Sequence, residues 1–230
     1  MNLPAGAQVF TFEFEMHFLD DALWFPPVED AMDDGLLAVG GDLSIERLLL
    51  AYSNGIFPWF NEDELPMWWS PDPRFVLFPG ELKASKSMRQ LLKREHFEFR
   101  IDTAFGDVIY NCSRMPREGQ DGTWISDEVI TAYTALHQLG YAHSAEAWYD
   151  GELVGGLYGV LLGCVFFGES MFSHKSNASK YAFIKWVEVL KANGIVLIDC
   201  QVHTEHLESL GAGMISRAEF LAILKKSAGR

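Results

Sequence analysis

The sequence predicts an α+β protein with a small N-terminal domain, residues 1–75, and a larger C-terminal domain, residues 76–230, that contains a mixed sheet. Residues 1–75 are rich in aromatic residues and proline, as in Phe25-Pro26-Pro27. Helix and strand patterns alternate after that point. Within residues 142–202, antiparallel strands are followed by a crossover helix and one more strand, which is typical of a mixed sheet.

The N-terminal part contains one clear helix pattern. Asp42-Leu43-Ser44 is a helix start signal, the apolar-periodic stretch IERLLLAYSN follows, and Gly55 ends it. The composition changes near Arg74, which places the domain boundary between residues 72 and 80.

The C-terminal part predicts several helices and strands. The helices are expected near 85–94, at 102–111, 127–139 and 178–192, near 204–210, and from a capping box at Ser216 and Glu219 to Lys226. The strands are expected at 142–149, 152–160, 164–170 and 195–202. Asp150-Gly151 favours a two-residue hairpin between the first two strands.

The bulk composition is that of a globular protein rather than a disordered chain. The chain has 230 residues, 49% of them hydrophobic, and a net charge of −14, which on its face argues against a nucleic-acid partner. Three cysteines without CxxC spacing fit a reduced, cytoplasmic protein. No signal peptide or membrane span is expected, because the longest uncharged stretch, 153–168, is short and rich in glycine.

Two polar residues share one face of the strand IVLIDCQV. Asp199 and Gln201 are two positions apart, so both side chains are expected on the same side, with Cys200 on the other. Ligands often bind at such a strand end in mixed sheets. The spacing alone favours the simpler reading, in which Asp199 caps the next helix and Gln201 is solvated.

The stretch VFFGESMFSHKSNASK, residues 165–180, places a carboxylate after an apolar strand. Burying Glu169 without a partner would be costly. The loop 173–179 precedes a helix, so its amides are candidates for an anion, although Ser176 or Asn177 capping that helix is an equal alternative. The acyl-CoA loop pattern [QR]-x-x-G-x-[GA] is absent, which argues against a CoA substrate.

Cys200, His203 and His206 have the spacing C-x2-H-x2-H. Structural zinc sites have paired short spacings in two places, and no second cluster is evident in the sequence. We therefore expect no metal site here, and a helix start that carries histidines.

Residues 83–94, KASKSMRQLLKR, form a basic segment in an acidic protein. It contains five cations and no acid: Lys83, Lys86, Arg89, Lys93 and Arg94. Lys86, Arg89 and Lys93 fall on one helix face. Such a run is usually a solvated face, but the contrast with the rest of the chain favours contact with a phosphate backbone.

Taken together, these strings resemble the leucyl/phenylalanyl-tRNA–protein transferases of the bacterial N-end degradation pathway. The matching stretches include LLAVGGDLS (36–44), AYSNGIFPWF (51–60), WWSPDPR (68–74), GESMFSHKSNASK (168–180), LIDCQ (197–201) and HLESLGA (206–212). The resemblance implies a GNAT-like core in the larger domain. It also implies transfer of Leu or Phe, less often Met, from tRNA to proteins that begin with Arg or Lys.

The resemblance implies roles for the polar residues. Gln201 would orient the acceptor α-amine or accept its proton, Asp199 would hold Gln201, and Glu169 would attract the cationic acceptor. The basic segment 83–94 would hold the tRNA through phosphates. An aminoacyl ester is already activated, so no cofactor or metal is expected. We expect a monomer.

The donor side chain would need an apolar slot. By the same resemblance, Leu157, Phe166, Met171 and Ile198 would line it. Four aromatic residues match family positions near the donor adenosine or the pocket, namely Trp59, Tyr52, Trp124 and Tyr133.

Two alternatives stay open on the sequence. One is a related transferase that uses acyl-CoA or acidic acceptors, against which stand the missing CoA loop and the carboxylates Glu169 and Asp199. The other is a non-catalytic recognition module for basic N-termini. Loss of transfer with retained peptide binding on mutation of Asp199 and Gln201 would exclude it.

Overall fold

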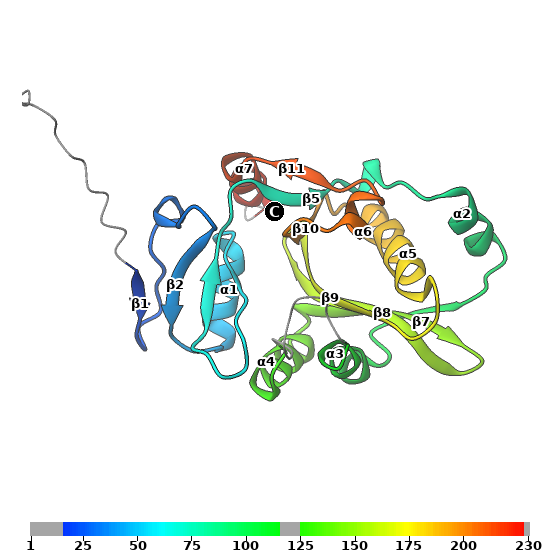
Figure 1. Ribbon diagram of the computed structural model, residues 1–230, viewed down its shortest axis with the longest axis horizontal. Coiled ribbons are helices and arrows are strands. Elements are labelled where there is room, and N and C mark those ends of the chain that lie inside the picture. The colour runs from blue at the N-terminus through cyan, green and yellow to red at the C-terminus, as the bar shows by residue number, and fades with distance from the viewer. Residues whose placement is uncertain (1–15, 116–124, 228–230) are drawn as a thin grey trace, which may run out of the picture.

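The computed structural model describes residues 16–115 and 125–227. Two sheets organise the chain (Figure 1). The small N-terminal sheet has the order β1-β2-β4-β3 and comprises β1 (His17–Leu19), β2 (Leu36–Gly40), β3 (Phe57–Pro58) and β4 (Met67–Trp69). The helix α1 (Ile45–Ser53) lies beside it. The predicted small N-terminal domain is confirmed.

The large sheet has seven strands in the order β11-β5-β10-β9-β8-β7-β6. Their bounds are β5 (Arg74–Leu77), β6 (Glu98–Ile101), β7 (Ala142–Tyr149), β8 (Glu152–Leu162), β9 (Val165–Ser173), β10 (Leu197–Gln201) and β11 (Gly213–Ile215). β9 and β10 pair in parallel, and the other neighbouring strands of this sheet pair antiparallel. The predicted mixed sheet is confirmed.

Helices cover both faces of the large sheet (Figure 1). α3 (Phe105–Ser113) and α4 (Asp127–Gln138) lie on one face, and α5 (Ala178–Ala192) lies on the other. α2 (Lys86–Lys93), α6 (Glu205–Glu208) and α7 (Arg217–Ser227) complete the set, with short 3-10 helices at Val28–Asp30 and Pro79–Glu81. Two apolar cores result. One joins α1, α3, α4 and α7, and the other lies under α5.

Several local predictions are confirmed. α1 begins after Ser44, whose side chain accepts the N–H of Arg47, and Gly55, whose φ is +74°, follows its last turn. Asp150 and Gly151 form the two-residue turn between β7 and β8, both with positive φ. The crossover helix predicted at 178–192 matches α5.

Other predictions are wrong in their bounds. The helix expected at 102–111 begins at Phe105, after the unpredicted strand β6. The carboxylate of Glu146 on β7 accepts the N–H groups of Thr103 and Ala104 at 2.9 and 2.8 Å. A distant strand therefore fixes where this helix starts, which its own sequence does not reveal.

The two sheets meet near the predicted boundary. The small sheet ends at Trp69 and the large sheet begins at Arg74. The C-terminal helix α7 returns to this joint, where Phe220 and Leu224 belong to the same core as α1. Residues from both ends of the chain thus border the region between the sheets.

Candidate active site

A cavity of about 520 Å³ opens where β9 and β10 separate. Their parallel pairing spans only Leu197–Asp199 against Val165–Phe167. Beyond these residues both strands contribute to the cavity wall, which the small domain closes through Phe57, Pro58 and Trp59. The cavity thus lies at a strand end and between the two sheets, both of which are common positions for binding sites.

Two β-bulges aim the polar groups of this wall. In the pairing of β8 with β9, Gly159 faces Gly168 and Tyr158 faces Ser170, so Glu169 is the extra residue. In the pairing of β5 with β10, Cys200 is the extra residue between Asp199 and Gln201. Bulges redirect side chains and are frequent beside active sites. They bring Glu169 and Gln201 within hydrogen-bonding distance.

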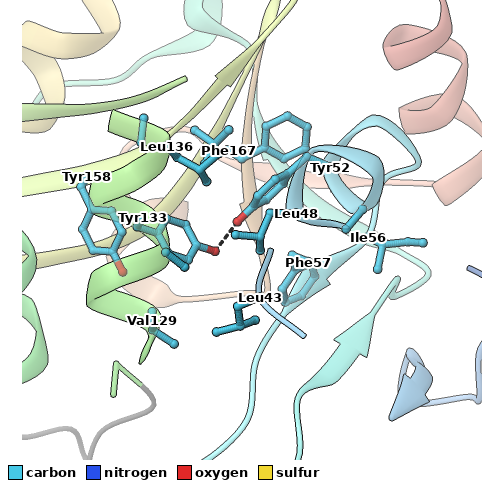
Figure 2. Packing of buried hydrophobic residues seen from close by; sticks show 14 of the residues in the cluster. Leu43, Leu48, Tyr52, Ile56, Phe57, Val129, Tyr133, Leu136, Tyr158 and Phe167 are labelled. Atoms are coloured by element: carbon cyan, nitrogen blue, oxygen red, sulfur yellow. Dashed lines mark hydrogen bonds between the residues drawn. The ribbon is translucent and has the colours of Figure 1, made fainter. Parts of the chain in front are cut away.

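Glu169 is the centre of a hydrogen-bonded cluster. Its Oε1 accepts from the Tyr52 hydroxyl at 2.8 Å and from Gln201 Nε2 at 3.1 Å, and its Oε2 accepts from the Tyr133 hydroxyl at 3.1 Å. The two phenol hydroxyls also contact each other, Tyr52 from α1 and Tyr133 from α4 (Figure 2). Tyr52, Tyr133 and Gln201 are therefore the hydrogen-bond partners of the Glu169 carboxylate.

The environment changes the acidity of these groups. Burial and the charge of Asp199 together raise the pKa of Glu169 to about 7, against the opposing hydrogen bonds from the two tyrosines and Gln201. Burial and the nearby carboxylate also raise the pKa values of Tyr52 and Tyr133 well above their ordinary range. Both phenols therefore keep their protons at neutral pH, whereas the carboxyl of Glu169 titrates near neutral pH.

Asp199 is held by a partner that the sequence analysis missed. Arg74 donates to both of its carboxylate oxygens, and both side chains are almost fully buried. The Arg74 guanidinium lies over the rings of Phe57 and Phe220, 4.6 and 4.7 Å from their centres. The simpler reading of Asp199 as a helix cap is wrong, since the side chain of Thr204 caps α6.

Gln201 has an unusual backbone. Its φ is +64°, a left-handed value that few residues other than glycine adopt. Asp199 Oδ1 accepts the backbone N–H of Gln201 at 2.9 Å. Asp199 thus fixes the main chain of Gln201, while the side chain of Gln201 reaches Glu169.

The structure places four of the eight residues predicted for donor binding at the cavity. Leu157, Met171, Ile198 and Trp59 line the cavity. Phe166 does not, because it is fully buried against Trp186 in the core. Tyr52 and Tyr133 are also fully buried and stand behind Glu169 rather than in the cavity wall. Trp124 lies outside the described residues.

The helix cap that the sequence offered at Asn177 does not form in the loop before α5. Asn177 is the N-terminal flanking residue, but its side chain makes no capping bond. Ser173 Oγ accepts the N–H of Ser179 at 3.3 Å instead and donates to the carbonyl of Lys175. Ser173 and Ser179 both line the cavity.

The basic segment 83–94 includes α2, on the part of the molecule away from the small domain (Figure 1). Its five cations are exposed, and in the described part of the chain none of them forms an ion pair. Met88 anchors the helix by its burial. The cations therefore face solvent with their charge uncompensated.

Within residues 16–115 and 125–227, no three His, Cys, Asp or Glu side chains gather as a metal site would require. No helix there is long and apolar enough to cross a membrane.

The fold and the cavity define an α+β protein with a largely apolar cavity whose polar end is the Glu169–Gln201 pair. Two family models match the chain, that of the leucyl/phenylalanyl-tRNA protein transferases over residues 76–225 and that of their N-terminal domain over residues 41–72. The chain belongs to this family. It is therefore an aminoacyltransferase that acts from tRNA to protein.

Individual relatives agree with the family models. The leucyl/phenylalanyl-tRNA–protein transferase of Chromobacterium violaceum is 58% identical over 88% of each chain. That of Syntrophobacter fumaroxidans is 57% identical over 91% of this chain and 89% of its own. A GCN5-related N-acetyltransferase-like protein from Streptococcus suis is a distant structural neighbour, with a TM-score of 0.37 and 14% identity over 72% of this chain and 61% of its own.

Proposed function

We propose that this enzyme transfers leucine or phenylalanine, and less often methionine, from tRNA to the α-amino group of proteins whose first residue is Arg or Lys. The observation that carries the proposal is a cavity with an apolar wall that ends at a carboxyl group and an amide. The apolar wall suits the donor side chain. The acidic end suits a cationic acceptor.

Leu157, Met171 and Ile198 form the donor slot in this proposal. All three line the cavity near Glu169. A slot made of these side chains discriminates by shape, and shape separates similar apolar groups only modestly, by about 1–3 kcal/mol per methylene. Methionine is a pliable lining residue. These properties support acceptance of Leu, Phe and Met together.

Glu169 attracts the basic N-terminal residue of the acceptor. The positive charge of that residue offsets the cost of a carboxylate in a largely buried wall. Gln201 orients the α-amine, and Asp199 holds the main chain of Gln201 rather than relaying a proton, because Arg74 occupies both of its oxygens. Positioning of this kind accelerates an already activated ester.

The cations of the basic segment 83–94 bind the phosphates of the tRNA without reading its sequence. Their exposure and lack of ion pairs in the described residues support this contact. Loop 173–179 lies beside the cavity and is assigned to the 3′ end of the donor. In the cell, the product would enter N-end-rule degradation, and we place the enzyme in the cytoplasm as a monomer.

The test is a transfer assay analysed by mass spectrometry. Leucyl-tRNA and a peptide that begins with Arg should give a Leu-Arg-peptide, and the same peptide with an acetylated N-terminus should give none. Absence of product with Leu, Phe and Met donors alike would refute the proposal. Acyl transfer from acetyl-CoA in the absence of tRNA would support the rival acetyltransferase function instead.

A further inference from the structure

Three oxygen-to-oxygen contacts close a ring around the carboxyl of Glu169. They join Tyr52 to Oε1, Tyr133 to Oε2, and the two hydroxyls to each other. Each phenol carries one proton, so an ionised carboxylate leaves only two protons for three contacts. A third proton, on the carboxyl itself, would give every contact a donor. The ring therefore has one open proton position when Glu169 is charged.

We propose that Glu169 is the proton acceptor of the transfer reaction, and that Tyr52 and Tyr133 are positioning residues that complete a hydrogen-bonded ring when Glu169 takes a proton from the acceptor α-ammonium group. This inference rests on the proposed function. It deepens that function, because the basic acceptor residue then meets Glu169 through its α-ammonium group.

The geometry leaves room for this proton transfer. An ionised carboxylate has about four acceptor positions. Tyr52, Tyr133 and Gln201 fill three of them, and Oε2 accepts from Tyr133 alone among the described residues. Glu169 lines the cavity, so one acceptor position remains for the substrate amine. The Gln201 side chain holds the other oxygen.

The other polar groups around Glu169 are poorer proton acceptors. Asp199 is occupied by Arg74, and burial raises the pKa of the Cys200 thiol, which stays protonated. Tyr158 lies edge-on to Tyr133, with ring centres 5.6 Å apart. His206 also lines the cavity, and burial with the nearby Lys180 lowers its pKa, so it is a rival base that must be tested.

The pKa values of the proton donor, which is the α-ammonium group, and of the proton acceptor, which is Glu169, are close to each other. An α-ammonium group has a pKa of about 8, and that of Glu169 is about 7. Proton transfer between them is therefore unfavourable by only about tenfold, whereas an ordinary Glu side chain would make it unfavourable by roughly 3,000-fold or more. A general base works best when its pKa lies near the working pH.

Acyl transfer follows the proton transfer to Glu169. Glu169 takes one proton from the α-ammonium group, and the free amine attacks the ester carbonyl carbon. The C–N bond forms and the bond from the carbonyl carbon to the ribose oxygen breaks. The second proton of the attacking nitrogen goes to the ribose oxygen, which leaves as a hydroxyl. Glu169 returns its proton to solvent before the next turnover.

The test measures single-turnover transfer of leucine to an Arg-peptide from about pH 5 to pH 9, the range in which both groups titrate. The wild-type rate should fall as the pH drops through about 7. Tyr133→Phe removes a donor to the carboxylate, so the midpoint should rise by roughly one pH unit. Tyr181→Phe, an equal change on α5 outside the cavity wall, should leave it in place.

Glu169→Gln removes the proton acceptor while keeping the hydrogen-bonded ring that supports the fold. The amide has the shape of the protonated carboxyl and donates a hydrogen bond in its place, so the ring stays closed without a base. At pH 8 and above, where Glu169 is ionised in the wild type, the rate should fall by about 100-fold or more, and the limb with its midpoint near 7 should vanish. A loss of less than tenfold in the transfer rate of Glu169→Gln would overturn the proposal. So would a pH midpoint that does not move in Tyr133→Phe. Loss of the acidic limb of the pH profile in His206→Asn would also overturn it.

Infrared spectroscopy gives a readout without substrate. The carbonyl band of a protonated carboxyl, absent in Glu169→Gln, should titrate near pH 7 in the wild type. Titration near the ordinary 4.5 would overturn the proposal. If the wild-type enzyme gives no transfer product, the proposed function is wrong. If it gives product but the midpoint does not move in Tyr133→Phe, the function stands and the proton assignment is wrong.

Discussion

Arg74 and Asp199 form a buried bidentate ion pair, with Nε 2.8 Å from Oδ1 and Nη2 2.7 Å from Oδ2. Arg74 is the first residue of β5, and its guanidinium is held between Phe57 of the small sheet and Phe220 of α7. Asp199 in turn accepts the N–H of Gln201. The pair therefore ties the joint between the two sheets to the backbone of the candidate site.

Loss of one partner of this pair should be costly. Asp199→Asn leaves the Arg74 charge buried and uncompensated, which should lower the free energy of unfolding by about 3–5 kcal/mol. Urea unfolding measures this value. The double variant Arg74→Met with Asp199→Leu should recover much of the stability without recovering transfer, since the N–H of Gln201 still lacks its acceptor. An Asp199→Asn variant as stable as the wild type would contradict this prediction.

The stability of the protein should depend on pH through Glu169. Its pKa rises from an ordinary 4.5 to about 7 in the folded protein, so the folded state binds the proton more tightly. Glu169 therefore favours folding at low pH, and this contribution is lost as the pH rises from about 4.5 to about 7, up to about 3 kcal/mol in total.

The comparison of wild type with Glu169→Gln isolates this effect, because all other titrating groups cancel. The difference between their unfolding free energies should move in favour of the glutamine variant as the pH rises from about 4.5 to about 7. A difference that stays constant over this range would show that the carboxyl has an ordinary pKa.

The donor slot should be widened by Ile198→Ala. Ile198 is buried and lines the cavity, so its truncation makes room for a larger side chain. The ratio of kcat/KM for phenylalanyl-tRNA to that for leucyl-tRNA should rise by about tenfold. Ile184→Ala removes the same atoms from α5 outside the cavity wall. It should cost stability, about 2–4 kcal/mol, and leave the ratio unchanged.

The basic segment 83–94 should set the salt dependence of tRNA binding. Lys86→Ala with Arg89→Ala should raise the KM for aminoacyl-tRNA and flatten its dependence on salt, with a slope lower by about 1.5 to 2. Lys225→Ala with Lys226→Ala removes the same charge from the exposed end of α7 and serves as the control. Equal slopes in the two double variants would mean that the segment is only a solvated face.

The sequence predicted the elements whose signals are local. The Asp150-Gly151 turn, the helix α1 and the crossover helix α5 each have their own start, stop or turn residues, and each is confirmed. The strands β1, β3, β4 and β11 have two or three residues each, too few for a periodic pattern. They form because neighbouring strands supply hydrogen bonds, which a local pattern does not contain.

The candidate site also combines features that local sequence patterns predict with features that depend on distant parts of the chain. Glu169, Asp199 and Gln201 stood out in the sequence as polar residues next to apolar strands, and they meet in the structure. Arg74 and Asp199 are 125 positions apart, and Tyr52 and Glu169 are 117 positions apart. The two bulges that turn Glu169 and Gln201 toward each other depend on register with neighbouring strands, so period-2 alternation alone does not predict them.

The most direct test of the account is a crystal structure with a phenylalanyl-adenosine analogue that carries an amide in place of the ester. The phenyl ring should lie among Leu157, Met171 and Ile198, with the carbonyl carbon beside the Glu169–Gln201 pair. An analogue bound elsewhere, or bound with its ring away from these three side chains, would contradict the proposed site.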